Sequence, residues 1–364
     1  MTVASEDQRF MAAALRLSRW HTGLTGANPS VGCLVVKDGV ILGSGVTAID
    51  GRPHAETQAL GMAGTNASGA TLYVTLEPCS HHGKTPPCAD AIVAAGIARV
   101  VVSLADPDPR VSGRGLAILR DHGITVDGAI MEEEVRRALQ AYLMRQLRGR
   151  PHVTLKLAVS ADGMIGRKGA GQVAITGAGA RAQSHLVRAE TDAILVGIGT
   201  ALADDPELTC RTPGLENLSP LRIVLDRRLD LPLRSKLVYT ASDTPVMVVS
   251  LGDRDADDAG REDRGAMLSA AGVELLTAET LQTFLNTLAA RGLSSILIEG
   301  GATVARSFLD AGLVDRILLF EGTVNVGADG IASPIQRSDM PHGYRLVRSS
   351  QFGTDHCHEY ERFS

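Results

Sequence analysis

One histidine, one glutamate and two cysteines between positions 54 and 88 are the residues of this sequence best suited to chemistry. His54, Cys79 and Cys88 are ligands of the kind that Zn²⁺ prefers, and three protein ligands leave the fourth tetrahedral position to a water molecule. Zinc brings the pKa of such a water near neutrality and so supplies a nucleophile. Glu56, two residues after the histidine, is placed to carry protons. The pattern is typical of zinc-dependent deaminases that act on nucleobases.

The spacing of the two cysteines departs from the usual form of this pattern. Such deaminases commonly place two residues between them, whereas eight residues, 80 to 87, separate Cys79 from Cys88 here. The longer segment must leave the metal and return, and we expect it to reach a phosphate or sugar of the substrate. It is polar and basic, with His81, His82, Lys84 and Thr85. The alternative is that the cysteines are merely buried, since free cysteine often packs as a small hydrophobic residue.

The length and composition are those of a globular protein with two domains. The 364 residues exceed the size at which a single core usually stops growing. Hydrophobic residues make up 44% of the chain and charged residues 21%, which is ordinary for a globular domain. A net charge of −5 and an aromatic content of 3% argue against a nucleic-acid-binding protein, because such proteins neutralise phosphates and stack bases on aromatic rings. A small anionic substrate stays compatible with this charge.

The sequence also indicates where the protein works. The polar residues at positions 1–9 lack the apolar core of a signal peptide, and no apolar run approaches the ~20 residues that span a bilayer. The five cysteines are sparse and unevenly spaced, which favours a reducing compartment over a disulfide scaffold. We therefore expect a cytoplasmic protein without a membrane or nucleic-acid partner. A homo-oligomer is compatible with these observations.

Helices and strands alternate over the first part of the chain. Apolar spacing predicts a helix over 10–18, and Lys37-Asp38-Gly39 is a hairpin turn between strands 31–36 and 40–46. Further along we expect helices at 54–62, 87–95 and 131–147 and strands at 71–76 and 98–104. The metal ligands would then lie at the starts of two neighbouring helices, where the helix dipole favours a thiolate.

Gly, Arg and Pro at positions 148–151 form the best candidate linker. After it, apolar runs predict strands at 152–159, 193–197, 221–225, 246–250, 295–298 and 317–320, with helices at 180–189, 281–290 and 302–311. The charged segment 253–264 is expected to be a surface loop. Alternating strands and helices imply a second α/β domain.

With these motifs in place, the sequence resembles the bifunctional deaminase/reductase family of riboflavin biosynthesis. The resemblance covers nearly the whole chain. Its first half rests on NPSVGC at 28–33, PHAE at 53–56, TLEPCSHHGKTPPC at 75–88 and DPDPRVSGRG at 106–115. Its second half rests on KLAVSADG at 156–163, LADDPELT at 202–209 and EGG at 299–301.

The resemblance implies an α/β protein with two domains and two reactions. Residues 1–150 would form a three-layer, cytidine-deaminase-like domain that binds zinc. Residues 151–364 would form a dihydrofolate-reductase-like domain that uses NADPH. The substrate implied is a small pyrimidine ribose phosphate, 2,5-diamino-6-ribosylamino-4(3H)-pyrimidinone 5′-phosphate. It would lose its 2-amino group by hydrolysis, and the ribosyl group would then be reduced to ribityl.

The resemblance also implies roles for individual residues. Glu56 would be the catalytic proton carrier beside a zinc ion held by His54, Cys79 and Cys88. The substrate-binding positions would be Asn28, Lys84, Gln172, Arg188, Leu208, Arg211 and Glu299. The cofactor-binding positions would be Ala158, Ala174, Thr200, Asp204, Gly301, Ala302, Thr303, Val304, Ala305, Arg306 and Ser307. The two arginines suit a phosphate because a guanidinium offers a fork of donors, although each is equally typical of an ion pair.

Two departures from the family pattern motivate an alternative. Ala174 stands where the family commonly has tryptophan, and Asp108 replaces an asparagine. The missing tryptophan motivates one alternative, a deaminase whose second domain only binds ligand. A separate alternative is a polynucleotide deaminase acting on tRNA, which would need a basic groove and a single catalytic domain. His356, Cys357 and His358 do not form a plausible metal site, because alternate residues of a strand point to opposite faces. Cys33 is expected to lie in the core.

Overall fold

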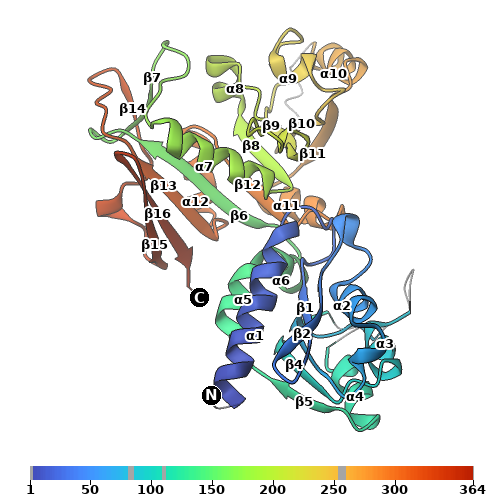
Figure 1. Cartoon of the computed structure of the whole chain (residues 1–364). Coiled ribbons are helices and arrows are strands. Elements are labelled where there is room, and N and C mark those ends of the chain that lie inside the picture. The colour runs from blue at the N-terminus through green and yellow to red at the C-terminus, as the bar shows by residue number, and fades with distance from the viewer. Residues whose placement is uncertain (1–2, 81–85, 109–111, 253–259, 364) are drawn as a thin grey trace. The chain divides into compact units, whose positions relative to one another are not determined.

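A five-stranded sheet in the order β2-β1-β3-β4-β5 organises residues 1–149 of the computed structural model (Figure 1). The structure describes residues 3–80, 86–108, 112–252 and 260–363. β1 (Gly32–Lys37) pairs antiparallel with β2 (Val40–Val46) and β3 (Thr71–Leu76). β3, β4 (Arg99–Leu104) and β5 (Thr125–Gly128) run parallel.

Helices cover both faces of this sheet, which gives the three layers that were predicted. On one face, α1 (Val3–Ser18) packs Phe10 and Met11 against alternate residues of β1. On the other face, α2 (Ala55–Ala63) packs against the side of β1 that carries Cys33. Cys33 is fully buried, so its predicted place in the core is confirmed. The remaining elements of this unit are η1 (Arg19–His21), η2 (Ile49–Gly51), η3 (Gly64–Ala67), α3 (Cys88–Ala94), α4 (Arg114–Asp121), α5 (Glu132–Ala138) and α6 (Gln140–Arg148).

Two glycines of β2 allow α2 to lie directly on the sheet. A Cβ atom at Gly43 would lie 2.1 Å from the carbonyl oxygen of Ala59, and one at Gly45 would lie 2.2 Å from that of Ala55. Any larger residue would push the helix outward, because atoms do not approach this closely in packed interiors. The close approach sets the position of the N-terminus of α2, where His54 and Glu56 lie.

The predicted helix over 131–147 is two helices. α5 ends and α6 begins at Leu139, whose backbone angles (φ −99°, ψ 9°) are not those of an α-helix. The short strand β5 was not predicted, because only its two middle residues are half-buried and its ends are exposed. Sequence periodicity is weak over so short and so exposed a segment.

Residues 150–364 form a second compact unit around a nine-stranded sheet. The strand order is β11-β10-β9-β8-β12-β6-β13-β16-β15. The seven strands from β11 to β13 are parallel, and β16 and β15 are antiparallel to their neighbours. The strands are β6 (His152–Val159), β8 (Ala193–Gly197), β9 (Leu221–Leu225), β10 (Val246–Leu251), β11 (Glu274–Ala278), β12 (Ser295–Ile298), β13 (Arg316–Glu321), β15 (Tyr344–Phe352) and β16 (Asp355–Arg362).

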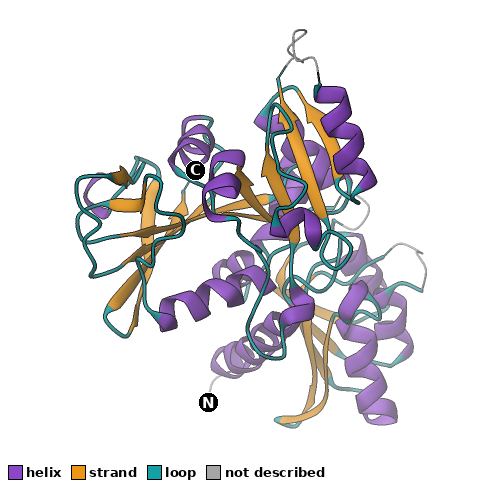
Figure 2. Cartoon of the chain, turned by 90° about the horizontal axis from the view of Figure 1, so that it is seen from above, coloured by secondary structure: helices purple, strands orange, loops and turns teal. Residues whose placement is uncertain are grey.

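Helices pack on both faces of the second sheet, as expected for parallel strands buried on two sides. α11 (Leu281–Ala290) and α12 (Ala302–Asp310) place Phe284 and Phe308 in one core, and α7 (Ala178–Ala189) packs Ala180 against β13 on the other face. Helices are purple and strands orange in Figure 2. The remaining elements are β7 (Met164–Arg167), α8 (Ile198–Asp204), η4 (Glu216–Leu218), α9 (Lys236–Tyr239), α10 (Arg261–Ala270), β14 (Gly330–Ala332) and η5 (Arg337–Asp339).

The charged segment 253–264 differs in part from its prediction as a surface loop. Residues 253–259 lie outside the described residues, and from Arg261 onward the chain is helical. The sequence did not predict the start of this helix, because acidic and basic residues fill its first turn. A core-facing helix is usually recognised by its apolar stripe. Along β16, the rings of His356 and His358 stack with centroids 6.2 Å apart, which confirms that they share a face. None of the described helices is both long and apolar enough to cross a bilayer.

Candidate functional site

His54, Cys79 and Cys88 come together where three segments of the first unit meet. His54 is the N-cap residue of α2, Cys88 is the first residue of α3, and Cys79 follows the end of β3. The Nδ1 atom of His54 lies 3.6 Å from the Sγ atom of Cys79 and 3.4 Å from that of Cys88. Zinc–nitrogen and zinc–sulfur bonds at a tetrahedral angle put the two ligand atoms about 3.6 Å apart. The three residues therefore fit a zinc ion, and in the described part of the chain they are the one such group of potential ligands.

The electrostatics of the two thiols also suit a cation. Hydrogen bonds from Cys88 and His54 lower the pKa of Cys79 to about 4, although burial opposes the shift. The lowered pKa favours the thiolate form of Cys79, which is the form that binds metal. The pKa of Cys88 is raised, first by its contact with Cys79 and then by burial. A divalent cation between the sulfur atoms would reverse this shift, because metal-bound thiols lose their proton.

Glu56 lies in the first turn of α2, next to this group. It is only 4% exposed. Burial raises its pKa to about 7, with the neighbouring Cys79 acting in the same direction and His54 opposing it. A carboxyl group with a pKa near neutrality can both accept and release a proton at physiological pH. The local structure thus gives Glu56 the property that a proton carrier needs.

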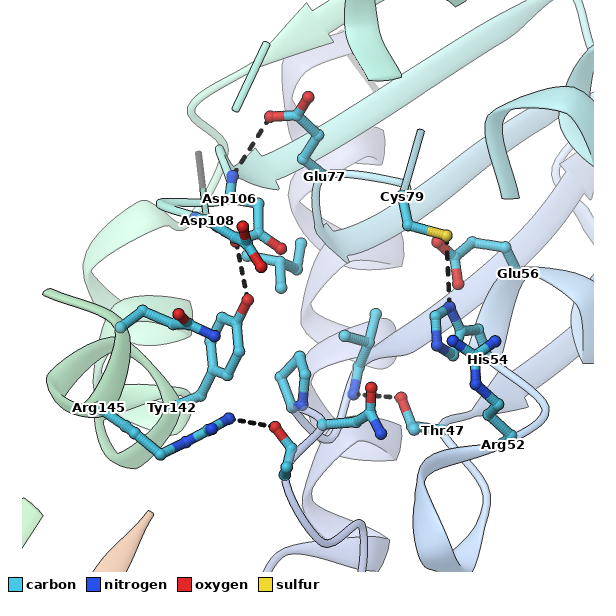
Figure 3. Close-up of a pocket in the computed structure, with 16 residues that line it drawn as sticks. Thr47, Arg52, His54, Glu56, Glu77, Cys79, Asp106, Asp108, Tyr142 and Arg145 are labelled. Carbon is cyan, nitrogen blue, oxygen red and sulfur yellow. Dashed lines mark hydrogen bonds between the residues drawn. The ribbon is translucent and has the colours of Figure 1, made fainter. Parts of the chain in front are cut away.

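These residues open onto a cavity of about 200 Å³ in the first unit. Figure 3 shows His54, Glu56 and Cys79 on one side of it, and Asp106, Asp108 and Tyr142 on the other. Asn28, which the sequence indicated as a substrate-binding residue, lines the same cavity. Lys84, indicated for the same role, lies outside the described residues. Lining residues that sequence reasoning missed are Arg52, Glu77, Asp106, Tyr142, Arg145 and Gln146.

Glu77 holds the loop that forms one wall of the cavity. Its Oε2 atom accepts hydrogen bonds from the backbone N–H groups of Asp106 (3.3 Å) and Gly113 (3.1 Å), and its Oε1 atom accepts one from Gly115 (3.2 Å). Glu77 is 3% exposed, so water cannot easily replace these bonds. The carboxylate therefore ties the end of β3, two residues before Cys79, to the loop that carries Asp106 and Asp108.

We expect Glu77→Gln to impair deamination while zinc stays bound. An amide can accept hydrogen bonds only through its oxygen, so the variant loses part of the set that fixes the loop. Hydrogen bonds to a charged group are worth about 1.5–3 kcal/mol, which corresponds to a loss of roughly 10- to 100-fold in kcat/KM for ammonia release. Glu134→Gln, at an exposed position of α5, is the matched control. Wild-type ammonia release by Glu77→Gln would contradict the role of the carboxylate.

In the second unit, two of the residues indicated as substrate-binding contact each other. The Nε and Nη2 atoms of Arg188 donate to the two carboxylate oxygens of Glu299 at 2.7 Å and 3.0 Å. Lys156, which the sequence did not single out, lies 3.6 Å from the same carboxylate. Burial alone would raise the pKa of Glu299, but Arg188 and Lys156 outweigh it and lower the pKa to about 2. The fork of Arg188 is thus directed at a carboxylate of the protein.

The other indicated substrate positions are more dispersed. Arg211 is exposed and forms an ion pair of 3.0 Å with Glu207, and Gln172 is exposed in the segment before α7. Leu208 is buried with a left-handed backbone (φ 56°). The Nη1 atom of Arg188 donates to the carbonyl of the next residue, Thr209, at 2.9 Å. Leu208 therefore immediately precedes a residue that contacts Arg188. The backbone N–H of Arg211 donates to the Nδ1 atom of His185, on the same helix as Arg188 (3.2 Å).

The indicated cofactor positions lie mainly at the ends of β8 and β12, which are adjacent parallel strands. After β8 the chain continues through α8 to β9, which lies on one side of the β8–β12 pair in the sheet. After β12 it continues through α12 to β13, which lies on the other side of that pair. Open α/β sheets commonly bind ligands at such a point of divergence. The Oγ1 atom of Thr200 accepts a hydrogen bond from the N–H of Gly301 (3.0 Å), which joins the two indicated segments.

The remaining cofactor positions face in different directions. Ala305 is buried in the core beneath α12, while Thr303, Arg306 and Ser307 are exposed. Ala174 is also exposed. Ala158, Asp204, Ala302 and Val304 are half-buried, and burial raises the pKa of Asp204. Because a helix turns its side chains to all sides, residues 301–307 cannot all contact one ligand through their side chains.

Comparisons with known proteins agree with both units. The family described as "Cytidine and deoxycytidylate deaminase zinc-binding region" matches residues 4–104, and the family described as "RibD C-terminal domain" matches residues 151–358. The "Riboflavin biosynthesis protein RibD" of Aquifex aeolicus is 40% identical over 86% of both chains. The protein of the same name from Escherichia coli is 38% identical over 89% of both.

Solved structures are similar over the full length. "Acinetobacter baumannii RibD, form 2" has a TM-score of 0.87 at 34% identity and covers 100% of both chains. A Thermotoga maritima protein described as a diaminohydroxyphosphoribosylaminopyrimidine deaminase/5-amino-6-(5-phosphoribosylamino)uracil reductase has a TM-score of 0.85 at 32% identity, also over 100% of both. These matches confirm the predicted α/β fold of a deaminase domain followed by a reductase domain. The chain belongs to the RibD family of riboflavin biosynthesis proteins.

Proposed function

We propose that this enzyme carries out two consecutive steps on one pyrimidine ribose phosphate, each in its own part of the chain. Residues 1–150 would remove the 2-amino group of 2,5-diamino-6-ribosylamino-4(3H)-pyrimidinone 5′-phosphate by hydrolysis. Residues 151–364 would reduce the ribosyl group to ribityl with NADPH. The name of the Thermotoga maritima relative, which covers both a deaminase and a reductase, supports this proposal. All five cysteines are free, which supports a cytoplasmic location.

The observation that carries the first half is the meeting of three metal ligands and a buried carboxyl group with a pKa near neutrality in one cavity. A zinc ion held by His54, Cys79 and Cys88 would polarise water for attack on the ring carbon that bears the amino group. Glu56 would take a proton from the attacking water and pass it to a ring nitrogen. It would then take the proton of the hydroxyl group added to that carbon and deliver it to the departing amine. The C–N bond breaks as the carbonyl forms, so that water is consumed and ammonia released. Asn28 would hold the ring by hydrogen bonds.

For the second step, NADPH supplies the hydride and the protein supplies position and charge. Thr200 and Gly301 lie where two adjacent strands end and their connections diverge, a common place for a nucleotide. At Gly300 a Cβ atom would lie 3.3 Å from that of Val304 and 3.4 Å from the backbone nitrogen of Gly197. The absence of a side chain there lets the first turn of α12 lie close to the end of β8 and suits a closely bound cofactor. Arg188 and Glu299 would orient the ribosyl group.

One coupled assay tests both halves of the proposal. The purified enzyme with zinc is given the diaminopyrimidinone ribose phosphate and NADPH, and ammonia release and NADPH oxidation are recorded together. We expect one NADPH to be oxidised for each ammonia released, with NADPH oxidation lagging behind. Ammonia release without NADPH oxidation would reduce the second unit to a ligand-binding module. Failure to release ammonia would overturn the proposal for the first unit.

A further inference from the structure

The cavity of the first unit is divided by charge. Its wall beside Tyr142 carries the carboxyl groups of Asp106 and Asp108, with Glu77 next to them. The strongly basic side chains among its described lining residues are Arg52 and Arg145. Figure 3 shows Arg52 beside His54, and Arg145 across the cavity from them. A phosphate dianion would be attracted to one of these two arginines.

The chemistry of the substrate selects between the two arginines. The ring carbon that loses its amino group must face His54, Cys79 and Cys88. The ribosyl phosphate is attached through position 6 of the ring and extends away from that carbon. Arg52 lies on the metal side, beside His54 (Figure 3). A phosphate at the end of an extended ribosyl group would therefore lie on the side of Arg145.

The guanidinium of Arg145 is held in place before any ligand binds. Its Nη2 atom donates to the carbonyl oxygen of Ala27, next to Asn28 in the cavity wall. Its central carbon lies 6.0 Å from the ring centroid of Tyr142, within the range of a cation–π contact. The Tyr142 hydroxyl in turn donates to Asp106 at 2.9 Å. A side chain fixed on both sides loses little conformational entropy when it binds a ligand.

We propose that Arg145 binds the 5′-phosphate of the substrate in the deaminase cavity, an inference that rests on the proposed function. The planar guanidinium matches a phosphate monoester better than an ammonium does, because it can donate two parallel hydrogen bonds. Arg145 lies on α6, far in the sequence from the metal ligands. The competing explanation is that Arg145 only fastens Ala27 and its neighbours.

The test compares Arg145→Met with Arg148→Met, an exposed arginine on the same helix that does not line the cavity. Ammonia release is measured with the phosphorylated substrate and with the same compound bearing a free 5′-hydroxyl. A charge-assisted hydrogen bond of about 1.5–3 kcal/mol predicts that Arg145→Met loses roughly 10- to 100-fold in kcat/KM for the phosphorylated compound, mainly through KM. The 5′-hydroxyl compound should be deaminated equally by the wild type and both variants. Arg145→Lys should recover part of the loss.

Inorganic phosphate provides a second measurement. It should inhibit wild-type ammonia release competitively, and its inhibition constant should rise in Arg145→Met but not in Arg148→Met. Equal losses with both compounds, or an unchanged inhibition constant, would overturn the proposal and leave Arg145 a structural role. A wild-type enzyme that releases ammonia from neither compound would instead refute the proposed function, so the two failures are distinguishable. Zinc content, measured for every variant, should stay at the wild-type value.

Discussion

Glu56→Gln is expected to abolish ammonia release while the zinc ion stays bound and NADPH-dependent reduction continues. Glutamine keeps the size of the side chain but can neither take a proton from water nor return one to the amine. Loss of a general acid–base group typically costs 10²- to 10⁴-fold, and we expect the upper part of that range because one carboxyl group serves several proton transfers. The measurements are ammonia release, zinc content by atomic absorption, and NADPH oxidation with the separately prepared deaminated intermediate.

The reductase reaction provides a control for correct folding when the deaminase reaction is lost. The deaminated intermediate bypasses the first step, so a correctly folded variant should still oxidise NADPH at the wild-type rate. Glu134→Gln should match the wild type in both assays, because its side chain is exposed on α5. Ammonia release within a few-fold of wild type by Glu56→Gln would show that another group carries the protons. Loss of zinc would instead show that Glu56 supports the ligands.

The metal ligands were predictable because their information is local. The motif around His54 and Glu56 predicts the N-terminus of one helix. The structure places Cys79 and Cys88 next to His54 at that N-terminus. The opposite wall was not predictable, because Asp106 and Tyr142 meet only when a loop and a helix far apart in the sequence pack together. Nothing in the residues flanking Tyr142 indicates a partner 36 positions earlier.

The strands show the same difference between features that depend on local sequence and features that depend on distant partners. Apolar runs such as β8 and β12 were located correctly because parallel strands buried on both faces are continuously hydrophobic. β15 was not predicted, and of β16 only residues 356–358 were treated as a strand, because this hairpin is rich in charged residues. Glu359 of β16 is nevertheless buried, because Arg316 and Arg348 pair with it from the neighbouring strands. Such burial of charge depends on partners that a single strand does not disclose.

Glu299→Gln should destabilise the second unit and abolish reduction without changing ammonia release. The substitution leaves the positive charges of Arg188 and Lys156 without their buried counter-charge. Breaking a buried pair in this way typically costs 3–5 kcal/mol. Hydrogen exchange followed by mass spectrometry, read from peptides of residues 150–364, measures the free energy of unfolding of this unit. Glu274→Gln removes an ion pair with Arg291 that is largely exposed and should change it by less than about 1 kcal/mol.

The pH dependence separates the effect of charge from that of shape. The pKa of Glu299 is about 2 in the folded protein, against 4.5 for an ordinary glutamate. A lowered folded-state pKa stabilises the protein fully above pH 4.5, and this contribution is lost as the pH falls towards 2. It amounts to about 3 kcal/mol, since each pKa unit corresponds to about 1.4 kcal/mol. The stability difference between the wild type and Glu299→Gln should therefore shrink over that range, because glutamine does not titrate. A difference that persists at pH 2 would mean that glutamine packs poorly and that the charge is not the cause.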